Sequence, residues 1–242
     1  MSSFPVNPGM SIFELISRRA GENPNRVSYT MLDEDLQVTE SLTYAQLDRQ
    51  SRQLAGQLLK HEPGTRALIL VPSTISFMVA FLGCLHAGVV AVPAPVPDAN
   101  QIKQRSPRLR AIAQDCAPKI VISAERTAEL VRAACDSTAE LTGCEHVLLE
   151  SGDEPAEPGR LRPARPGDVA YLQYTSGSTA TPKGVMVSQR NLLEQSSALS
   201  MSLDYRPTAS VSAGCPTSTT SACSKGRCCP CTTAFRRSRS RR

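Results

Sequence analysis

Residues 168–193 read DVAYLQYTSGSTATPKGVMVSQRNLL, and this stretch decides the fold. It opens with a predicted strand over 168–174, which is rich in apolar and aromatic residues. A polar loop over 175–184 follows, and a second predicted strand covers 185–188. Helical spacing of apolar residues then predicts a helix over 189–201. The stretch therefore predicts two strands joined by a polar loop and followed by a helix.

The loop over 175–184 is rich in groups that bind phosphate. Hydroxyl groups and backbone amides can surround a polyphosphate, and Lys183 adds a positive charge. The loop is not a Walker A motif, which needs Gly-Lys-Ser/Thr at the start of a helix. Here Pro182 precedes Lys183 and a strand is predicted to follow. A surface loop without a ligand is the alternative that composition alone leaves open.

Helices and strands alternate before this stretch. Helices are predicted at 11–20, 43–60, 75–87, 108–116 and 125–135, and strands at 27–31, 36–39, 66–71, 89–92, 119–123 and 147–149. Residues 152–167 are rich in Pro, Gly and Glu and are expected to form a surface loop. Continuous apolar strands between helices indicate an α/β fold whose parallel sheet is covered on both faces. Such folds bind ligands at the carboxyl ends of their strands.

Composition is typical of a soluble globular protein. The chain has 242 residues, of which 40% are hydrophobic and 20% charged. It has no Trp and few aromatic residues, which argues against an aromatic-rich nucleic-acid reader. The N-terminus has no secretory signal, so we expect a cytoplasmic protein. The uncharged run at 74–92 is expected to be a buried helix and strand rather than a membrane span.

Composition changes after Pro207. All 22 acidic residues precede this position, whereas residues 208–242 carry seven of the 27 basic ones. The last segment also holds five cysteines, Cys215, Cys223, Cys228, Cys229 and Cys231. Cys228 and Cys231 have C-x₂-C spacing, but no second such pair and no nearby histidine complete a four-ligand zinc site, so we predict no metal ligands. We likewise predict that the basic run at 236–242 is not a nucleic-acid site.

The remaining cysteines and histidines are assigned no catalytic role. Cys84, Cys116, Cys135 and Cys144 are expected to be free thiols, mostly buried. His86 falls within a predicted buried helix and is expected in the core. His61 and His146 lie at the ends of predicted elements with no evident carboxylate or cysteine partner.

The order of residues in 168–193 resembles the phosphate-binding signature of the AMP-forming adenylating enzymes. These include acyl-CoA synthetases, nonribosomal-peptide adenylation domains and fatty acyl-AMP ligases. LTYAQLDRQSRQLAGQLL at 42–59 resembles an early helix of the family, and FMVAFLGCLHAGVVAVPAPVP at 77–97 resembles a helix–strand pair that follows it. The YLQY lead-in at 171–174 is most similar to the fatty acyl-AMP ligase branch. The resemblance covers residues 4–207 and implies the N-terminal part of the large adenylating domain.

This resemblance implies that a carboxylic acid, a fatty acid in this branch, reacts with ATP to give an acyl-adenylate and pyrophosphate. The acyl group then passes to the phosphopantetheine thiol of an acyl carrier protein, or to CoA in a sister branch. ATP with Mg²⁺ would be held by residues matched to the signature: Thr175, Ser176, Gly177, Ser178, Thr179, Thr181, Lys183 and Gly184. The alternatives are an acyl-CoA synthetase, a nonribosomal-peptide adenylation domain or a non-catalytic nucleotide-binding remnant.

Two departures from the signature are expected to weaken phosphate binding. Ala180 stands where the family usually has glycine, and a Cβ is costly there if the backbone needs a positive φ. Gln189 and Arg190 replace the customary pair that contains histidine.

The family's later motifs have no counterpart in this chain, so we expect it to be catalytically inactive as it stands. When read one base out of frame from Pro207, the codons permit DSVSVSWLPHFHDFGLLEGPLLPLYNGIP, which resembles the family's next core motif. We therefore predict a partial AMP-binding domain over 1–207. Residues 208–242 are expected to be an aberrant, frameshifted and disordered tail.

Overall fold

The computed structural model describes residues 11–33, 35, 37–72, 75–97, 107–149, 162–175 and 182–202 of the chain. The chain divides into two units, Met1–Ser197 and Ala198–Arg242. Of the second unit, the structure describes only the last turn of a helix. The elements below belong to the first unit, apart from that turn.

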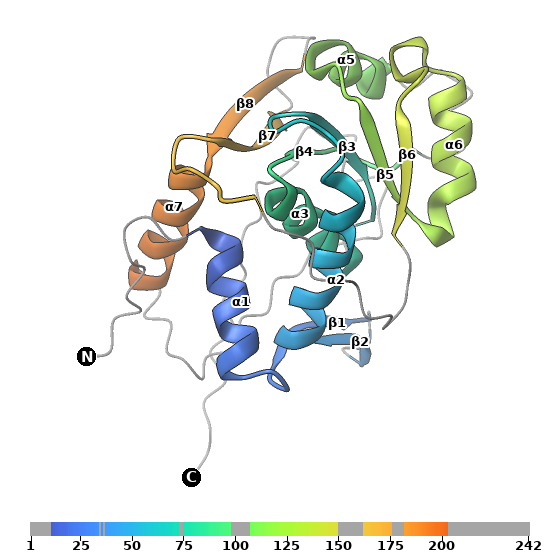
Figure 1. Ribbon diagram of the computed structural model, residues 1–242. Helices are drawn as coiled ribbons and strands as arrows, with labels where there is room; N and C mark the ends of the chain where they lie inside the picture. Colours follow the sequence, from blue (N-terminus) through green and yellow to red (C-terminus); the bar gives the residue numbers. More distant parts are fainter. Residues whose placement is uncertain are drawn as a thin grey trace. The chain divides into compact units, whose positions relative to one another are not determined.

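A six-stranded sheet forms the centre of the first unit (Figure 1). Its strands lie in the order β6-β5-β3-β4-β7-β8. They are β3 (Arg66–Leu70), β4 (Val90–Pro93), β5 (Ile120–Ala124), β6 (Glu145–Leu149), β7 (Val169–Thr175) and β8 (Lys183–Ser188). All neighbours are parallel except β8, which runs antiparallel to β7 at the edge. A separate antiparallel ribbon pairs β1 (Val27–Leu32) with β2 (Val38–Thr43).

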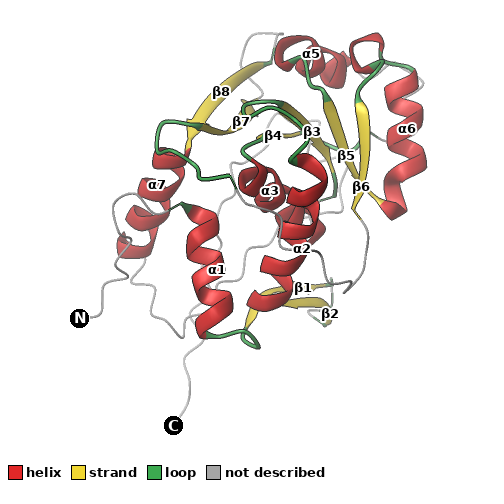
Figure 2. Cartoon of the chain, viewed as in Figure 1, coloured by secondary structure: helices red, strands yellow, loops and turns green. Residues whose placement is uncertain are grey.

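Helices cover both faces of this sheet (Figure 2). They are α1 (Ile12–Glu22), α2 (Tyr44–Leu58), α3 (Ile75–Ala87), α5 (Pro107–Cys116), α6 (Ala128–Asp136) and α7 (Gln189–Ser202). Side chains alternate along β3, so Ile69 joins a core with α2 and α3, whereas Leu68 and Leu70 join a second core with α5 and α6. The predicted α/β fold, with a mostly parallel sheet flanked by helices, is confirmed.

Two helix starts carry reciprocal caps that the local sequence specifies. The Ser11 hydroxyl accepts a hydrogen bond from the Glu14 amide, and the Glu14 carboxylate accepts one from the Ser11 amide at 2.6 Å. Thr43 and Gln46 form the same capping box at the start of α2. Each box pairs amide groups that the helix itself leaves without partners. Ser11 therefore caps α1, and Thr43 caps α2.

Several predicted boundaries shift. The second ribbon strand was expected at 36–39 but covers Val38–Thr43, and Thr43 both ends this strand and caps α2. The helix expected over 125–135 begins as a 3₁₀ turn, Glu125–Thr127, before α6. A second 3₁₀ turn, Ala139–Leu141, precedes β6. These are differences at element ends, where local hydrogen bonds decide between competing conformations.

The uncharged run at 74–92 is a buried helix and strand, as predicted. It supplies α3 and most of β4, whose residues lie largely in the core. Within the described residues, no helix combines the length and the apolarity needed to cross a membrane.

The end of the segment expected as a surface loop is held in place. Arg162 Nη1 donates to His61 O at 2.5 Å and Ala87 O at 3.3 Å, and its Nη2 donates to Leu59 O at 2.5 Å. One guanidinium therefore binds carbonyl groups at the C-terminal ends of both α2 and α3. Residues 162–167 are thus positioned by a long-range contact that composition alone does not reveal.

The body cysteines are free thiols, as expected. Cys84, Cys116 and Cys135 are buried and Cys144 is half-buried. Burial raises the pKa of Cys116 and of Cys135 to about 12 in each case. Such thiols remain protonated at neutral pH and are poor nucleophiles.

His86 lies in the core, as predicted. It is fully buried, and its ring centroid lies 4.8 Å from that of Phe13. Neither ring nitrogen has a hydrogen-bond partner within the described part of the chain. Burial, reinforced by the charge of Arg52, lowers the pKa of His86 to about 4. The folded protein therefore holds this imidazole in its neutral form at pH 7.

We expect the pH dependence of stability to report this burial. The unfolded chain protonates His86 near pH 6.5 and the folded chain only near pH 4, so protons favour the unfolded state as the pH falls through this window. The loss of folding stability caused by His86 is absent above pH 7 and reaches about 2 kcal/mol at pH 5. Urea unfolding at pH 8 and pH 5 measures it. The His86→Leu variant should lose less stability over the same interval, and an equal loss would contradict the assignment.

Candidate functional site

The arms of the candidate phosphate loop are two adjacent antiparallel strands. Thr175 at the end of β7 pairs with Lys183 at the start of β8, and Tyr174 pairs with Gly184. Paired residues of this kind lie about 5 Å apart. The second strand was predicted over 185–188 and begins two residues earlier. Lys183 and Gly184 are therefore strand residues.

This hairpin lies at the edge of the sheet where ligands of α/β folds bind. β7 is parallel to β4, and β4 is parallel to β3, so Thr175 stands at their carboxyl-terminal edge. The structure brings Thr175 and Lys183 together as the two ends of the loop. The other predicted loop positions, Ser176, Gly177, Ser178, Thr179 and Thr181, and the substituted Ala180, lie outside the described residues.

Lys183 offers a positive charge at this edge. Its side chain is exposed and makes no hydrogen bond or ion pair within the residues that the structure describes. An ammonium group on a flexible stem can follow a polyanion without first breaking an existing pair. The position therefore suits contact with a phosphate group.

Packing against Tyr174 requires a residue without a side chain at position 184. A Cβ built on Gly184 would lie 2.9 Å from both Cζ and Oη of Tyr174, the residue opposite it on β7. The Tyr174 hydroxyl in turn donates a hydrogen bond to the carboxylate of Asp115, near the end of α5. Burial chiefly, and then this hydrogen bond, raise the pKa of Tyr174. The tyrosine therefore stays protonated at neutral pH and links the hairpin to α5.

We expect Gly184→Ala to destabilise the protein by about 1–2 kcal/mol, because the added methyl group meets the Tyr174 ring. Urea unfolding measures the change. The same substitution in a Tyr174→Ala background should cost less than half as much, since the obstructing ring is then gone. Equal costs in the two backgrounds would show that Tyr174 does not limit position 184.

Gln189 and Arg190 stand far from this loop. β8 carries the chain across the sheet from Lys183, so Gln189 lies about 20 Å further along. The backbone amide of Gln189 donates to Asp168 O, and the backbone amide of Arg190 donates to Pro166 O. The structure thus places this departure from the family signature at the amino-terminal edge of the sheet, opposite the edge where Thr175 and Lys183 lie.

The histidines lie outside the candidate site. Nε2 of His61 lies 3.2 Å from Oε2 of Glu145, and Nζ of Lys60 lies 2.6 Å from Oε1 of the same carboxylate. The expectation that His61 has no carboxylate partner was therefore wrong. The hydrogen bond from Lys60 is the main cause of a lowered pKa at Glu145. This group ties the end of α2 to β6, and its partners are too distant in sequence to be seen as a motif.

Comparisons with known proteins find relatives along most of the chain. The sequence model of the family described as "AMP-binding enzyme" matches residues 16–223. Medium-chain-fatty-acid–[acyl-carrier-protein] ligase JamA of Moorena producens is 33% identical over 198 residues, which cover 81% of this chain and 33% of that protein. Putative fatty-acid–CoA ligase fadD25 of Mycobacterium tuberculosis is 37% identical over 186 residues, covering 74% of this chain and 31% of the relative.

A solved structure shows the same fold. The fatty acyl-adenylate ligase from L. pneumophila, in complex with acyl adenylate and pyrophosphate, superposes with a TM-score of 0.66 at 31% identity. The match covers 81% of this chain and 33% of that one. The chain therefore spans about a third of the length of the relatives it matches. With its α/β sheet, its hairpin and a family match over most of its length, the chain belongs to the AMP-binding enzyme family.

Proposed function

We propose that this chain forms the ATP-phosphate-binding part of an AMP-forming ligase that activates a fatty acid. The observation that carries the proposal is the β7–β8 hairpin, which holds Thr175 opposite Lys183 at the carboxyl-terminal edge of the sheet. Within the described residues, the exposed Lys183 ammonium makes no ion pair. The names of the relatives support a fatty acid as the substrate, since each is a fatty-acid or fatty acyl ligase.

In the proposed reaction, a carboxylate oxygen attacks the α-phosphorus of ATP. The bond from this phosphorus to the bridging oxygen breaks, and pyrophosphate leaves with the electron pair. Lys183 and the hydroxyl and amide groups of Thr175, Ser176, Gly177, Ser178, Thr179 and Thr181 would hold the β- and γ-phosphates. Positive charge fixed there stabilises the negative charge that develops on the leaving group.

Mg²⁺ would reach this site bound to ATP. Within the described residues, no three His, Cys, Asp or Glu side chains gather to hold a metal ion. Mg²⁺ in ATP-dependent sites is commonly held by substrate phosphates and keeps several waters. The hydroxyl-rich loop and Lys183 suit such a complex, since they can bind the phosphate oxygens that the ion leaves free.

For the acyl acceptor, we propose the phosphopantetheine thiol of an acyl carrier protein. The name of JamA, a ligase to an acyl carrier protein, and the YLQY lead-in support this choice. CoA is the second candidate, because fadD25 is named a fatty-acid–CoA ligase. Transfer of a labelled acyl group to holo carrier protein, compared with transfer to CoA, separates the two when it is measured on the protein encoded by the gene with its reading frame restored.

Calorimetric titration of the chain with Mg-ATP tests the phosphate-binding part directly. We expect Mg-ATP to bind at one saturable site, and added Mg-pyrophosphate to compete with it for that site. Absence of binding at millimolar Mg-ATP would overturn the proposal. Octanoate-dependent exchange of pyrophosphate into ATP then tests acid activation. Binding without exchange would favour the alternative of a non-catalytic nucleotide-binding remnant.

We also propose that residues 1–207 belong to the AMP-binding domain and that a one-base deletion, or a read error of the same kind, near the Pro207 codon alters the reading frame after it. The support is the family-like sequence that the shifted frame permits. Resequencing the encoding DNA across this codon tests it. A frame that stands as printed would refute the change.

A further inference from the structure

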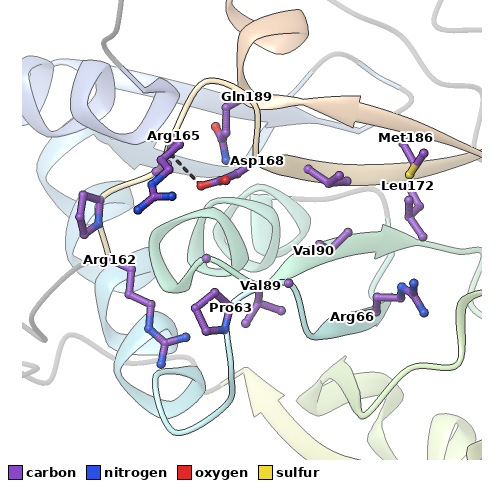
Figure 3. Close-up of a pocket in the computed structure, with 15 residues that line it drawn as sticks. Pro63, Arg66, Val89, Val90, Arg162, Arg165, Asp168, Leu172, Met186 and Gln189 are labelled. Carbon is purple, nitrogen blue, oxygen red and sulfur yellow. Dashed lines mark hydrogen bonds between the residues drawn. The ribbon is translucent and has the colours of Figure 1, made fainter.

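A cavity of about 630 Å³ lies at the amino-terminal edge of the sheet, opposite the edge that carries the phosphate loop (Figure 3). The first residues of β3, β4 and β7 line it, together with the end of β8, the start of α7 and residues 162–165. We call it the amino-edge cavity. Its volume falls within the range of small-molecule sites in proteins.

The interior of the amino-edge cavity is largely apolar. Val90 is the first residue of β4 and Val89 directly precedes it, whereas Val169 and Leu172 come from β7 and Met186 from β8. These side chains present a hydrocarbon surface to any molecule inside. Charged groups lie around this surface (Figure 3). The lining therefore suits a ligand with an apolar body and a polar head.

Two of the three arginines at the cavity already bind carbonyl oxygens. Arg66 Nη1 donates to Cys116 O at 2.8 Å, at the end of α5. Arg162 donates to carbonyls at the ends of α2 and α3, as described above. Helix C-termini carry partial negative charge, which offsets much of the charge on these two groups. Arg66 and Arg162 are therefore already engaged within the protein.

The third arginine and a buried amide remain open to a ligand. Arg165 is exposed, and its guanidinium has no partner within the described residues, whereas its backbone amide donates to Asp168 Oδ2 at 2.8 Å. Gln189 is only 4% exposed, and its Oε1 has no hydrogen-bond partner within the same part of the chain. Because the backbone amide of Gln189 donates to Asp168 O, the two residues are neighbours. Figure 3 shows the Gln189 side chain extending toward Arg165 and Asp168.

We propose that the amino-edge cavity binds a small amphipathic monocarboxylate that carries a hydrogen-bond donor beside its carboxylate. The Arg165 guanidinium would bind the carboxylate, and Gln189 Oε1 would accept a hydrogen bond from the donor. The apolar body would lie on Val90, Val169 and Leu172. A buried acceptor without a partner is rare in folded proteins, and a ligand donor would satisfy it. This site is separate from the phosphate loop and does not depend on its function.

The probe is 3-hydroxyoctanoate, with octanoate lacking the donor and 1-octanol lacking the charge. Methyl groups of ¹³C-labelled methionine report binding, because Met186 lines the cavity whereas Met31 and Met78 do not. We expect 3-hydroxyoctanoate to shift the methyl signal of Met186 saturably and to leave the methyl signals of Met31 and Met78 unchanged. Octanoate should bind several-fold more weakly and octanol more weakly still. No shift of Met186 at millimolar probe would overturn the proposal.

Variants assign the contacts. Arg165→Gln should weaken binding of 3-hydroxyoctanoate at least tenfold, and Gln189→Leu should remove its advantage over octanoate. Arg190→Gln is the matched control, because Arg190 is exposed, follows Gln189 and does not line the cavity. Lys183→Ala should leave binding unchanged and so separates this site from the phosphate loop. If Gln189→Leu does not fold, Arg165→Gln still decides, since unchanged affinity in that variant would refute the proposed carboxylate contact.

Discussion

Replacing Gly83 by leucine is expected to lower the free energy of unfolding by more than about 3 kcal/mol, a large share of the stability of a typical domain. Gly83 lies in α3 where this helix packs on α2. A Cβ added there would lie 2.6 Å from Leu54 Cδ2 and 3.0 Å from Leu54 Cβ. The second contact is close to the backbone of α2, so rotation of the Leu54 side chain alone cannot relieve it. The two helices would have to separate.

Two effects of opposite sign compete at this position. Removing a glycine from a helix interior favours the helix by up to about 1 kcal/mol. Overpacking a core costs about 1–3 kcal/mol for an added methylene or two, and leucine adds a branched chain beyond the Cβ. Packing therefore outweighs propensity. Urea unfolding followed by circular dichroism measures the difference.

Gly56 in α2 is the matched control. It is a helical glycine like Gly83, but a Cβ added to it meets nothing within 4 Å. Gly56→Ala should therefore stabilise the protein by about 0.5–1 kcal/mol through helix propensity alone. A Gly83→Leu variant that unfolds at the same urea concentration as the unmodified chain would show that α2 and α3 do not pack as closely as the structure indicates.

The sequence predicts the central elements well because their signals are local. The apolar segments that form β3, α3 and β4 lie between Gly and Pro residues, so their type and order follow from the pattern alone. Element ends are harder to predict, as Thr43 illustrates. Its β-branched side chain suits a strand and its hydroxyl suits a helix cap, and in the structure it serves both elements.

Contacts between distant residues are what the sequence does not reveal. Tyr174 binds Asp115, which lies 59 residues earlier, and Arg162 binds Leu59 O across 103 residues. Neither pair forms a pattern that can be seen along the chain. Gln189 gives a related case. Its place next to the phosphate signature suggested an effect on phosphate binding, but β8 carries it to the other edge of the sheet.

Replacing Lys183 by alanine is expected to weaken binding of Mg-ATP by about 100-fold. A hydrogen bond to a charged group contributes about 1.5–3 kcal/mol, which corresponds to about 10- to 100-fold in affinity. We expect the upper end, because the ATP phosphates carry several negative charges and Lys183 has no other partner within the described residues. Calorimetric titration of the variant measures the change.

Stability should hardly respond to the same substitution. Lys183 is exposed, and truncating an exposed side chain that makes no pair usually changes stability by no more than about 0.5 kcal/mol. Loss of ATP binding can then be assigned to the missing charge rather than to unfolding. Lys183→Arg, which keeps the charge, should recover part of the affinity, and added salt should weaken binding to the unmodified chain more than to Lys183→Ala.

Lys119 provides the matched control for charge alone. It is an exposed lysine that immediately precedes β5, so it lies at the amino-terminal edge of the same sheet. Lys119→Ala removes an equal charge from the protein but should leave the affinity for Mg-ATP unchanged. If both variants bind Mg-ATP as the unmodified chain does, the β7–β8 hairpin is not the phosphate site. If both substitutions weaken binding of Mg-ATP equally, the effect comes from the net charge of the protein. Only a loss of binding in Lys183→Ala that Lys119→Ala does not share places the phosphates at the carboxyl-terminal edge.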